Sequence, residues 1–282
     1  MTSLIKNAMT VDVEDYFQVG AFEHDIDRND WDILECRIER NMDIILKMFD
    51  DHSVKATFFT LGWIAQRYPK MIRKIVDNGH ELASHGMNHR RVSDQSRDEF
   101  FLDAQMSRHM LEDIGECQVK GYRAPSFSIG EKNLWALDAL LEAGYKYSSS
   151  IYPIKHDHYG MPSAPRFAFS PMDEQDFLEM PVTTVNFLGR KVPCGGGGYF
   201  RLLPYFISSL AMRRVNTKDK EACIFYFHPW EIDPEQPRQS QASRKSKFRH
   251  YTNLDVMERK LRKVLTDFSW SRMDDIFLSH PG

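Results

Sequence analysis

Two histidines four residues apart, His85 and His89 in the segment SHGMNH, are residues whose type and spacing suit metal chemistry. Imidazole is a frequent metal ligand, and a four-residue spacing can direct two rings at one ion. The same spacing also occurs on ordinary solvated surfaces, so the pair alone does not establish a site. A reaction centre needs a third ligand, a base and an acid from elsewhere in the chain.

A cluster of carboxylates near the amino terminus is suited to supply the ligand and the base. Asp12, Glu14 and Asp15 follow an apolar, strand-like run in the segment TVDVEDYF. Unpaired at a buried strand end, the three would repel one another, and a cation relieves that repulsion. Two neutral imidazoles and one carboxylate leave a coordination position open for water, as in catalytic metal sites, where the pKa of water falls to ~7. Another carboxylate of the cluster can then act as general base.

Two further polar residues follow apolar segments later in the chain. Arg123, in GYRAPSF, can orient a catalytic carboxylate through a two-point hydrogen bond. His228 ends the run CIFYFHPWE, where a nearby carboxylate such as Glu231 would hold the ring protonated as a general acid. Alone, Arg123 also fits a surface salt bridge and His228 a core histidine. Their shared position at strand ends, with the other two groups, indicates a site.

The elements that must position these groups alternate between strand and helix. We expect strands at 7–13, 55–62, 79–84, 118–124 and 145–150, and helices at 37–51, 68–79, 96–114 and 131–143. Such alternation predicts parallel strands with helical crossovers, in a barrel or a doubly wound sheet. In both architectures chemistry collects at the carboxyl ends of the strands, so all four polar groups are expected at one rim.

The second half of the chain has a looser pattern. Strands are expected within 177–184 and 222–231, and a helix at 254–268. We predict a single domain over 1–282, with a core of about 8–230 and an elaboration of about 152–282 interleaved with it. The run GGGG at 195–198 lacks the lysine of a phosphate loop and is expected to form a flexible lip over the site.

Composition and charge exclude several classes of protein. The 282 residues are 42% hydrophobic and 27% charged, which is typical of a soluble globular protein. The net charge of −3 argues against nucleic acid as a partner. There is no apolar run of the ~20 residues that a membrane span needs and no export signal at the amino terminus, so we expect a cytoplasmic protein. Its four scattered cysteines are expected to be free thiols.

The motifs TVDVEDYF, SHGMNH, RAP and FHPWE resemble, in order and approximate spacing, those of the polysaccharide deacetylases, the carbohydrate esterases (family 4) with the NodB homology domain. VEDYF and GGGGYFRLLP are similar to the subgroup associated with bacterial exopolysaccharide gene clusters. The resemblance implies a distorted (β/α) barrel of the NodB type and a divalent metal, usually zinc, with cobalt, nickel or manganese as alternatives. It also implies hydrolysis of N-acetyl groups on N-acetylhexosamine units of a bacterial polysaccharide or its lipid-linked precursor.

The resemblance also implies roles for individual residues. It makes Asp12 the base and His228 the acid, and Arg123 the residue that positions the base. It makes His85 and His89 the two imidazole ligands of the metal. It makes Ser126 the residue whose backbone N–H binds the oxyanion.

The first motif departs from the family pattern of two adjacent aspartates, because Val13 and Glu14 stand between Asp12 and Asp15. The third metal ligand is therefore either Glu14 or Asp15. The tryptophan of the family's fourth motif also has no clear counterpart in the segment FLEMPVTT.

Other readings of the chain remain open. One is an amidohydrolase of the same fold, or an O-acetyl esterase, acting on a small substrate. Another is a non-catalytic carbohydrate-binding protein. Residues 236–250 hold five Arg/Lys and no acid, which fits a mobile solvated loop or a contact with the inner membrane or a lipid-linked glycan. The sugar, the linkage, the chain length and the oligomeric state are not indicated.

Overall fold

The computed structural model describes residues 5–156, 160–172 and 176–278. Its strands are β1 Lys6–Val13, β2 Thr57–Thr60, β3 Glu81–Ser84, β4 Gly121–Tyr122, β5 Tyr147–Ser148, β6 Leu178–Glu179, β7 Thr184–Phe187, β8 Arg190–Pro193, β9 Ile224–Phe227 and β10 Ser269–Ser271. Its helices are α1 Ile38–Asp51, α2 Gly62–Arg67, α3 Pro69–Asp77, α4 Arg97–Gly115, α5 Trp135–Glu142, α6 Gly197–Leu202, α7 Tyr205–Arg214, α8 Arg244–Tyr251, α9 Leu254–Asp267 and α10 Met273–Phe277. Short helical turns include η1 Arg28–Ile33, η2 Val92–Asp94, η3 Pro125–Phe127, η4 Val215–Asp219 and η5 Pro229–Ile232.

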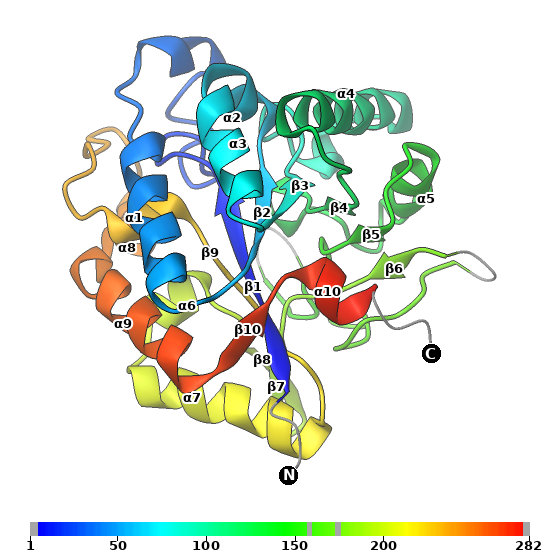
Figure 1. The fold of residues 1–282 in the computed structure, drawn as a ribbon, viewed down its shortest axis with the longest axis vertical. Coiled ribbons are helices and arrows are strands. Elements are labelled where there is room, and N and C mark those ends of the chain that lie inside the picture. The colour runs from blue at the N-terminus through cyan, green and yellow to red at the C-terminus, as the bar shows by residue number, and fades with distance from the viewer. Residues whose placement is uncertain (1–4, 157–159, 173–175, 279–282) are drawn as a thin grey trace.

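A curled parallel sheet forms the centre of the molecule. Its order is β10-β1-β2-β3-β4-β5-β6, and β9 also pairs with β1. All of its strand pairs are parallel, from β1 with β2 through β5 with β6. Helices α1 to α5 surround the outside of the curl, as Figure 1 shows. This arrangement confirms the distorted (β/α) barrel that the resemblance implies, which is one of the two architectures predicted by the alternation of strands and helices.

The long amphipathic helices form where the apolar spacing predicts them. On α1, Ile38, Met42, Ile45 and Phe49 share one face, and all four are buried. Burial of such a stripe against the sheet supplies most of the stability of a helix of this length. The expected helices at 96–114 and 254–268 appear as α4 and α9. The former begins with a capping box between Ser96 and Glu99.

Several elements differ from the expectation. The strand expected at 55–62 ends at Thr60, because Gly62 already begins α2 and donates its N–H to Gly86. The strand expected at 118–124 is reduced to β4. The segment 236–250, expected as a solvated loop, contains most of α8, and its two ends, Gln236 and His250, are buried and bonded to each other at 2.6 Å. No described helix is long and apolar enough to cross a membrane. All four cysteines are free, as expected.

The prediction that the glycine run forms a flexible lip is wrong, because the run closes the sheet. Gly195 and Gly196 are buried, and the Tyr226 N–H of β9 donates to the Gly195 carbonyl at 2.8 Å. Gly196 forms a parallel bridge with Tyr226, while Cys194 donates to the Thr183 carbonyl at 3.3 Å. The run therefore links the chain after β6 to β9, across the open side of the curl. Glycine is required because a side chain here would collide with a neighbouring backbone.

The glycine at 196 should be far harder to replace than one at 189. A Cβ on Gly196 (φ +114°) would lie 2.0 Å from the Tyr226 carbonyl oxygen, whereas one on Gly189 (φ +78°) meets nothing within 4 Å. Gly196→Ala should lower the free energy of unfolding by about 3 kcal/mol or more, because overpacking and backbone strain add. Gly189→Ala, with strain alone, should cost about 1–2 kcal/mol. Denaturant unfolding measures both, and equal losses would contradict the closing role of the run.

Candidate active site

Polar side chains from four strands meet at the carboxyl ends of the sheet. Asp12 and Glu14 lie at the end of β1, His85 directly after β3, Arg123 after β4 and His228 after β9. Because these strands are parallel and neighbours of β1 or β3, their carboxyl ends face the same rim. Except for His228, which is partly exposed, these side chains are almost fully buried.

Three of the buried groups form a set that fits a metal ion. Ligand atoms of Glu14, His85 and His89 lie within 4.8 Å of one another. The His85 Nδ1–H donates to the Arg123 carbonyl at 2.8 Å, which leaves the Nε2 lone pair available. Glu14 Oε2 is buried and makes no hydrogen bond of good geometry, although His89 Nε2 lies only 2.8 Å away. A cation between these atoms would satisfy all three ligands.

The protonation states in this cluster suit the same use. Burial lowers the pKa of His85 to about 4, so the ring is neutral near pH 7. Burial opposes the ionisation of Glu14, but His89, His228 and His85 outweigh it and hold the pKa of the carboxyl at about 2. A neutral imidazole and an ionised carboxylate are the forms in which these side chains bind divalent cations.

The structure places Glu14, and not Asp15, beside the two histidines. Asp15 Oδ2 accepts hydrogen bonds from the Arg37 N–H at 2.6 Å and the Cys36 thiol at 3.0 Å, and Oδ1 accepts from the Tyr16 N–H at 2.8 Å. Asp15 therefore anchors the loop after β1. Both carboxylates lie beyond β1, and the Glu14 N–H donates to the Asp12 carbonyl at 3.0 Å. This tight turn follows the strand at the point where Glu14 faces the histidines.

Arg123 holds Asp12 from the opposite side of the cluster. Its Nη1 donates to Asp12 Oδ1 at 2.6 Å and to Thr10 Oγ1 at 2.8 Å. Its Nε and Nη2 donate to the carbonyl and hydroxyl of Ser149 at 3.2 and 3.0 Å, and the guanidinium stacks on Phe59 at 4.0 Å. A single nitrogen reaches the carboxylate, so the expected two-point contact is wrong. The bonds from its other nitrogens to Ser149 fix the orientation of the guanidinium instead.

His228 faces the carboxylates with one ring nitrogen and Glu231 with the other. Its Nε2 lies 3.6 Å from Glu14 Oε1 and 3.9 Å from Asp12 Oδ2, and its Nδ1 lies 3.3 Å from Glu231 Oε2. Burial alone would lower the pKa of His228, but Glu231, Glu14 and Asp12 raise it to about 9. The ring is thus held protonated at the rim.

The segment after Arg123 has an unusual backbone. Ser126 and Phe127 both adopt left-handed conformations, with φ of +56° and +49°. Consecutive non-glycine residues in this region cost free energy and concentrate at functional sites. The geometry therefore makes the Ser126 N–H a candidate donor to a ligand, while its role toward an oxyanion stays a prediction.

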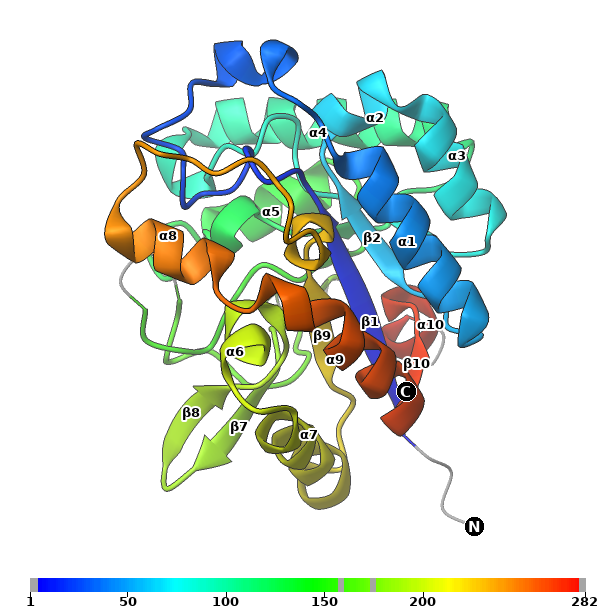
Figure 2. The ribbon, with the colours of Figure 1, turned by 90° about the vertical axis from the view of Figure 1, so that its left-hand side faces the viewer.

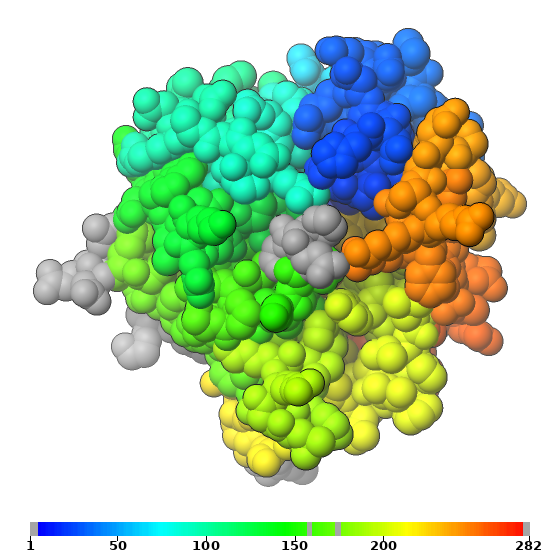
Figure 3. Space-filling model, turned by 180° about the vertical axis from the view of Figure 1, so that it is seen from behind, coloured from blue at the N-terminus to red at the C-terminus, as the bar shows by residue number. Residues whose placement is uncertain are grey.

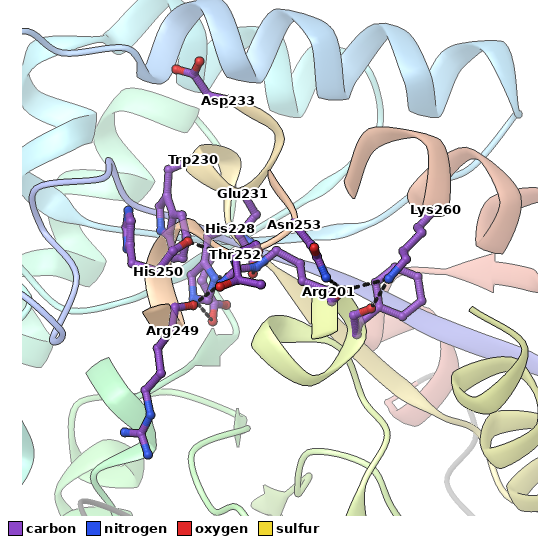
Figure 4. Close-up of polar contacts among 12 residues, drawn as sticks. Arg201, His228, Trp230, Glu231, Asp233, Arg249, His250, Thr252, Asn253 and Lys260 are labelled. Carbon is purple, nitrogen blue, oxygen red and sulfur yellow. Dashed lines mark hydrogen bonds and ion pairs between the residues drawn. The ribbon is translucent and has the colours of Figure 1, made fainter. Parts of the chain in front are cut away.

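A buried arginine that the sequence did not single out fixes the loop carrying His228. Arg201 Nε donates to Glu231 Oε1 at 2.7 Å, and its other nitrogens donate to backbone carbonyls of α8 and the residue that follows it, those of Arg249, His250 and Thr252, at 2.7–2.8 Å. Figure 4 shows these contacts converging from α6, η5 and the end of α8. Because Glu231 also binds His228, Arg201 acts on the histidine through that carboxylate.

A stack of rings supports the same histidine. His228 stacks on Trp230 at 5.1 Å and 18°, and Trp230 stacks on His250 at 4.0 Å and 14°. Phe22 contacts His250 at 4.6 Å and Tyr251 at 5.9 Å. Figure 3 shows the consequence on the surface, where the amino-terminal segment (blue) lies against the α8 region (orange). Aromatic residues are frequent in the sequence, but nothing in the sequence indicates which of them contact one another.

Comparison with known proteins agrees with the motifs. Residues 30–148 match the family described as polysaccharide deacetylase, and residues 149–278 match a domain of unknown function, DUF3473. The peptidoglycan-N-acetylglucosamine deacetylase of Bacillus cereus is 30% identical over 95 residues, 33% of this chain and 34% of that protein. The chitooligosaccharide deacetylase of Sinorhizobium fredii is 33% identical over 99 residues, 34% of this chain and 42% of that protein. The matches thus span well under half of these relatives.

Solved structures show the same fold at low identity. A Mycobacterium smegmatis protein described as a polysaccharide deacetylase has a TM-score of 0.60 at 18% identity, covering 96% of this chain and 89% of its own. PuuE allantoinase has a TM-score of 0.61 at 15% identity, covering 98% and 91%. These likenesses concern the fold alone. Together with the motif order, these findings show that the chain has the NodB fold and that its residues 30–148 are a polysaccharide deacetylase domain.

Proposed function

We propose that this chain is a metal-dependent hydrolase that removes N-acetyl groups from N-acetylhexosamine units of a bacterial polysaccharide or its lipid-linked precursor. One observation carries the proposal: a fixed carboxylate, a protonated histidine and a three-ligand set share one cluster. His228 Nε2 lies 3.9 Å from Asp12 and 3.6 Å from Glu14, and the ligand atoms of Glu14, His85 and His89 lie within 4.8 Å of one another. The relatives' names, which refer to peptidoglycan N-acetylglucosamine and chitooligosaccharides, support the substrate class.

Glu14, His85 and His89 would hold the cation. Two imidazole nitrogens and a carboxylate oxygen suit zinc, and cobalt, nickel and manganese also accept such ligands. When bound, a divalent ion supplies a water of lowered pKa and polarises a carbonyl oxygen. The buried Glu14 Oε2 without a hydrogen bond and the free Nε2 lone pair of His85 support this assignment.

Asp12 is placed to act as the base. Arg123 fixes Oδ1 at 2.6 Å, while Oδ2 faces the centre of the cluster at 3.9 Å from His228. The carboxylate takes the proton of the attacking water as the water oxygen bonds to the acetyl carbon. The Ser126 N–H donates to the oxygen that gains negative charge in that step.

His228 is placed to act as the acid. With Nδ1 bound to Glu231, its Nε2–H points toward the carboxylates and the reacting groups. It gives its proton to the sugar nitrogen as the carbon–nitrogen bond breaks, which releases acetate and a free amine. A carbohydrate-binding protein without turnover would have no use for this acid and base.

Other parts of the proposal concern the surroundings of the site. A single domain over 1–282 and a cytoplasmic location remain predictions. Residues 236–250 end at His250, in the ring stack beside His228, which supports a contact of their basic residues with an anionic or lipid-linked glycan. A small amide or acetyl ester as substrate is the rival reading within the same fold.

Replacing the base should remove turnover. Asp12→Asn should lower the rate of acetate release from chitooligosaccharides by about 10²–10⁴-fold, since a positioned base contributes that much. Asp219→Asn, which breaks an Arg–Asp pair outside the site, is the matched control and should keep the rate. Retention of a tenth of the activity in Asp12→Asn would refute its role. A panel of small amides and acetyl esters, assayed alongside, separates the rival substrates.

The identity of the third ligand can be tested by metal content. Glu14→Gln should lower zinc affinity at least tenfold, because it removes a charged ligand. Asp15→Asn should leave the affinity of the folded protein unchanged, since Asp15 binds the backbone of Tyr16 and Arg37. Calorimetric titration of the apo-protein with zinc measures both. The reverse pattern would assign the ligand to Asp15.

The arginine behind His228 should be structurally essential. Arg201→Met leaves the buried Glu231 with His228 as its cationic partner and frees three backbone carbonyls of their donor, so it should lower the free energy of unfolding by about 3–5 kcal/mol. Arg97→Met, which breaks an exposed pair with Glu142, should cost about 0–1 kcal/mol. Denaturant unfolding measures the two losses. A loss at Arg201 no larger than at Arg97 would show that the network does not fix the loop.

A further inference from the structure

Exposed apolar side chains gather on one face of the molecule. Of the thirteen large hydrophobic residues that are exposed in the described part of the chain, eight fall between positions 187 and 210: Phe187, Leu188, Val192, Tyr199, Leu202, Phe206, Ile207 and Leu210. They belong to the β7–β8 hairpin, α6 and α7, which lie together at the end of the molecule near the start of β1 (Figure 2). Scattered apolar residues need no explanation, but a contiguous patch marks a contact surface. We name these eight residues the hairpin–α7 face.

The tip of the hairpin has an apolar residue in a strained conformation. Phe187 pairs with Arg190, so the turn consists of Leu188 and Gly189, with φ of +49° and +78°. Two-residue turns of this type favour asparagine or glycine at both positions, because other side chains are strained there. Leu188 is 87% exposed, so no packing within the chain offsets the strain. The residue is suited to contact something outside the chain.

Two hollows adjoin this face. An apolar groove of about 420 Å³ is lined mainly by residues such as Val185, Phe200, Leu203 and Ile207. Beside it, a polar hollow of about 310 Å³ is lined by Arg166, Arg214 and Lys218, among others. Arg214 lines both hollows, so its positive charge lies at the boundary between the apolar and the polar surface.

The charge around the face is positive, although the chain carries −3 overall. Between residues 186 and 218 there is no acidic residue, and Asp219 is paired with Arg166 at 2.8 Å. The exposed cations of this stretch are Arg190, Arg213, Arg214 and Lys218, and beyond it the exposed Lys220 is followed by the exposed Glu221. An apolar patch edged by cations complements a surface with negatively charged headgroups over an apolar interior.

We propose that the hairpin–α7 face docks on an anionic lipid bilayer. Leu188, Phe187 and the exposed residues of α7 enter the interface, while Arg190, Arg214 and the neighbouring lysines meet lipid phosphates. Apolar insertion and basic residues together give stable peripheral binding where either alone is weak. A second copy of this chain fits less well, because a symmetric contact would bring the same cations against each other. This contact is separate from the one predicted for residues 236–250.

Vesicle co-sedimentation tests the proposal with phosphatidylcholine vesicles, with and without phosphatidylglycerol. The protein should bind the anionic vesicles, lose affinity as salt is raised, and show little binding to the neutral ones. The most informative variant is Leu188→Asn, because asparagine suits the turn. It should raise the thermal stability of the protein and weaken vesicle binding at the same time. Arg214→Gln with Lys218→Gln should weaken binding about fivefold for each cation removed.

Three controls keep the outcomes distinct. Ile33→Ser removes a side chain that is 82% exposed elsewhere, and Arg244→Gln with Lys247→Gln removes cations from α8; both should bind as the unaltered protein does. Asp12→Asn should also bind vesicles normally, so loss of deacetylation and loss of docking are read separately. The proposal is overturned if anionic vesicles are not bound, if Leu188→Asn binds undiminished, if the α8 variant alone loses binding, or if the face instead mediates a dimer that Leu188→Asn dissociates.

Discussion

Two buried carboxylates at the end of β1 determine which charged groups must surround them. Asp12 and Glu14 are almost inaccessible to water, and buried charges without partners cost several kcal/mol each. Arg123, which follows β4, forms an ion pair with Asp12, while His89 and His228 face Glu14. The parallel sheet brings these partners from distant segments to one rim. A divalent cation would complete the balance at Glu14, and we propose that Asp12 and His228 are the groups that move protons.

The second half of the chain is part of this machinery. The deacetylase family match covers 30–148, so it contains His85 and His89 but neither Asp12 nor His228. His228 and Arg201 lie in the region matched by DUF3473. There the glycine run joins the chain to β9, and Arg201 links Glu231 to the end of α8. The region that carries no functional description therefore contains His228, which we propose as the acid, the groups that hold it, and the hairpin–α7 face.

Short-range sequence patterns predicted the features of the fold that depend on neighbouring residues. The spacing on α1 and the polar residues at strand ends both follow from short-range chemistry. The choice between Glu14 and Asp15 was out of reach, since both lie beyond β1, where a tight turn ends the alternation of side chains. The glycine run was misjudged because its partner, Tyr226, is about thirty residues away. Helices α6 to α8 were missed because their exposed apolar and basic side chains give no amphipathic stripe, and β10 because it pairs with β1 from the other end of the chain.

The central claim is that Glu14, His85 and His89 share one cation beside Asp12 and His228. Crystals of the protein grown or soaked with zinc, and measured at the zinc absorption edge, test it directly. The account predicts one strong anomalous peak about 2.0–2.2 Å from nitrogens of both histidines and from an oxygen of Glu14. A peak bound by Asp15, or a cluster that stays without the ion while zinc binds elsewhere, would contradict it.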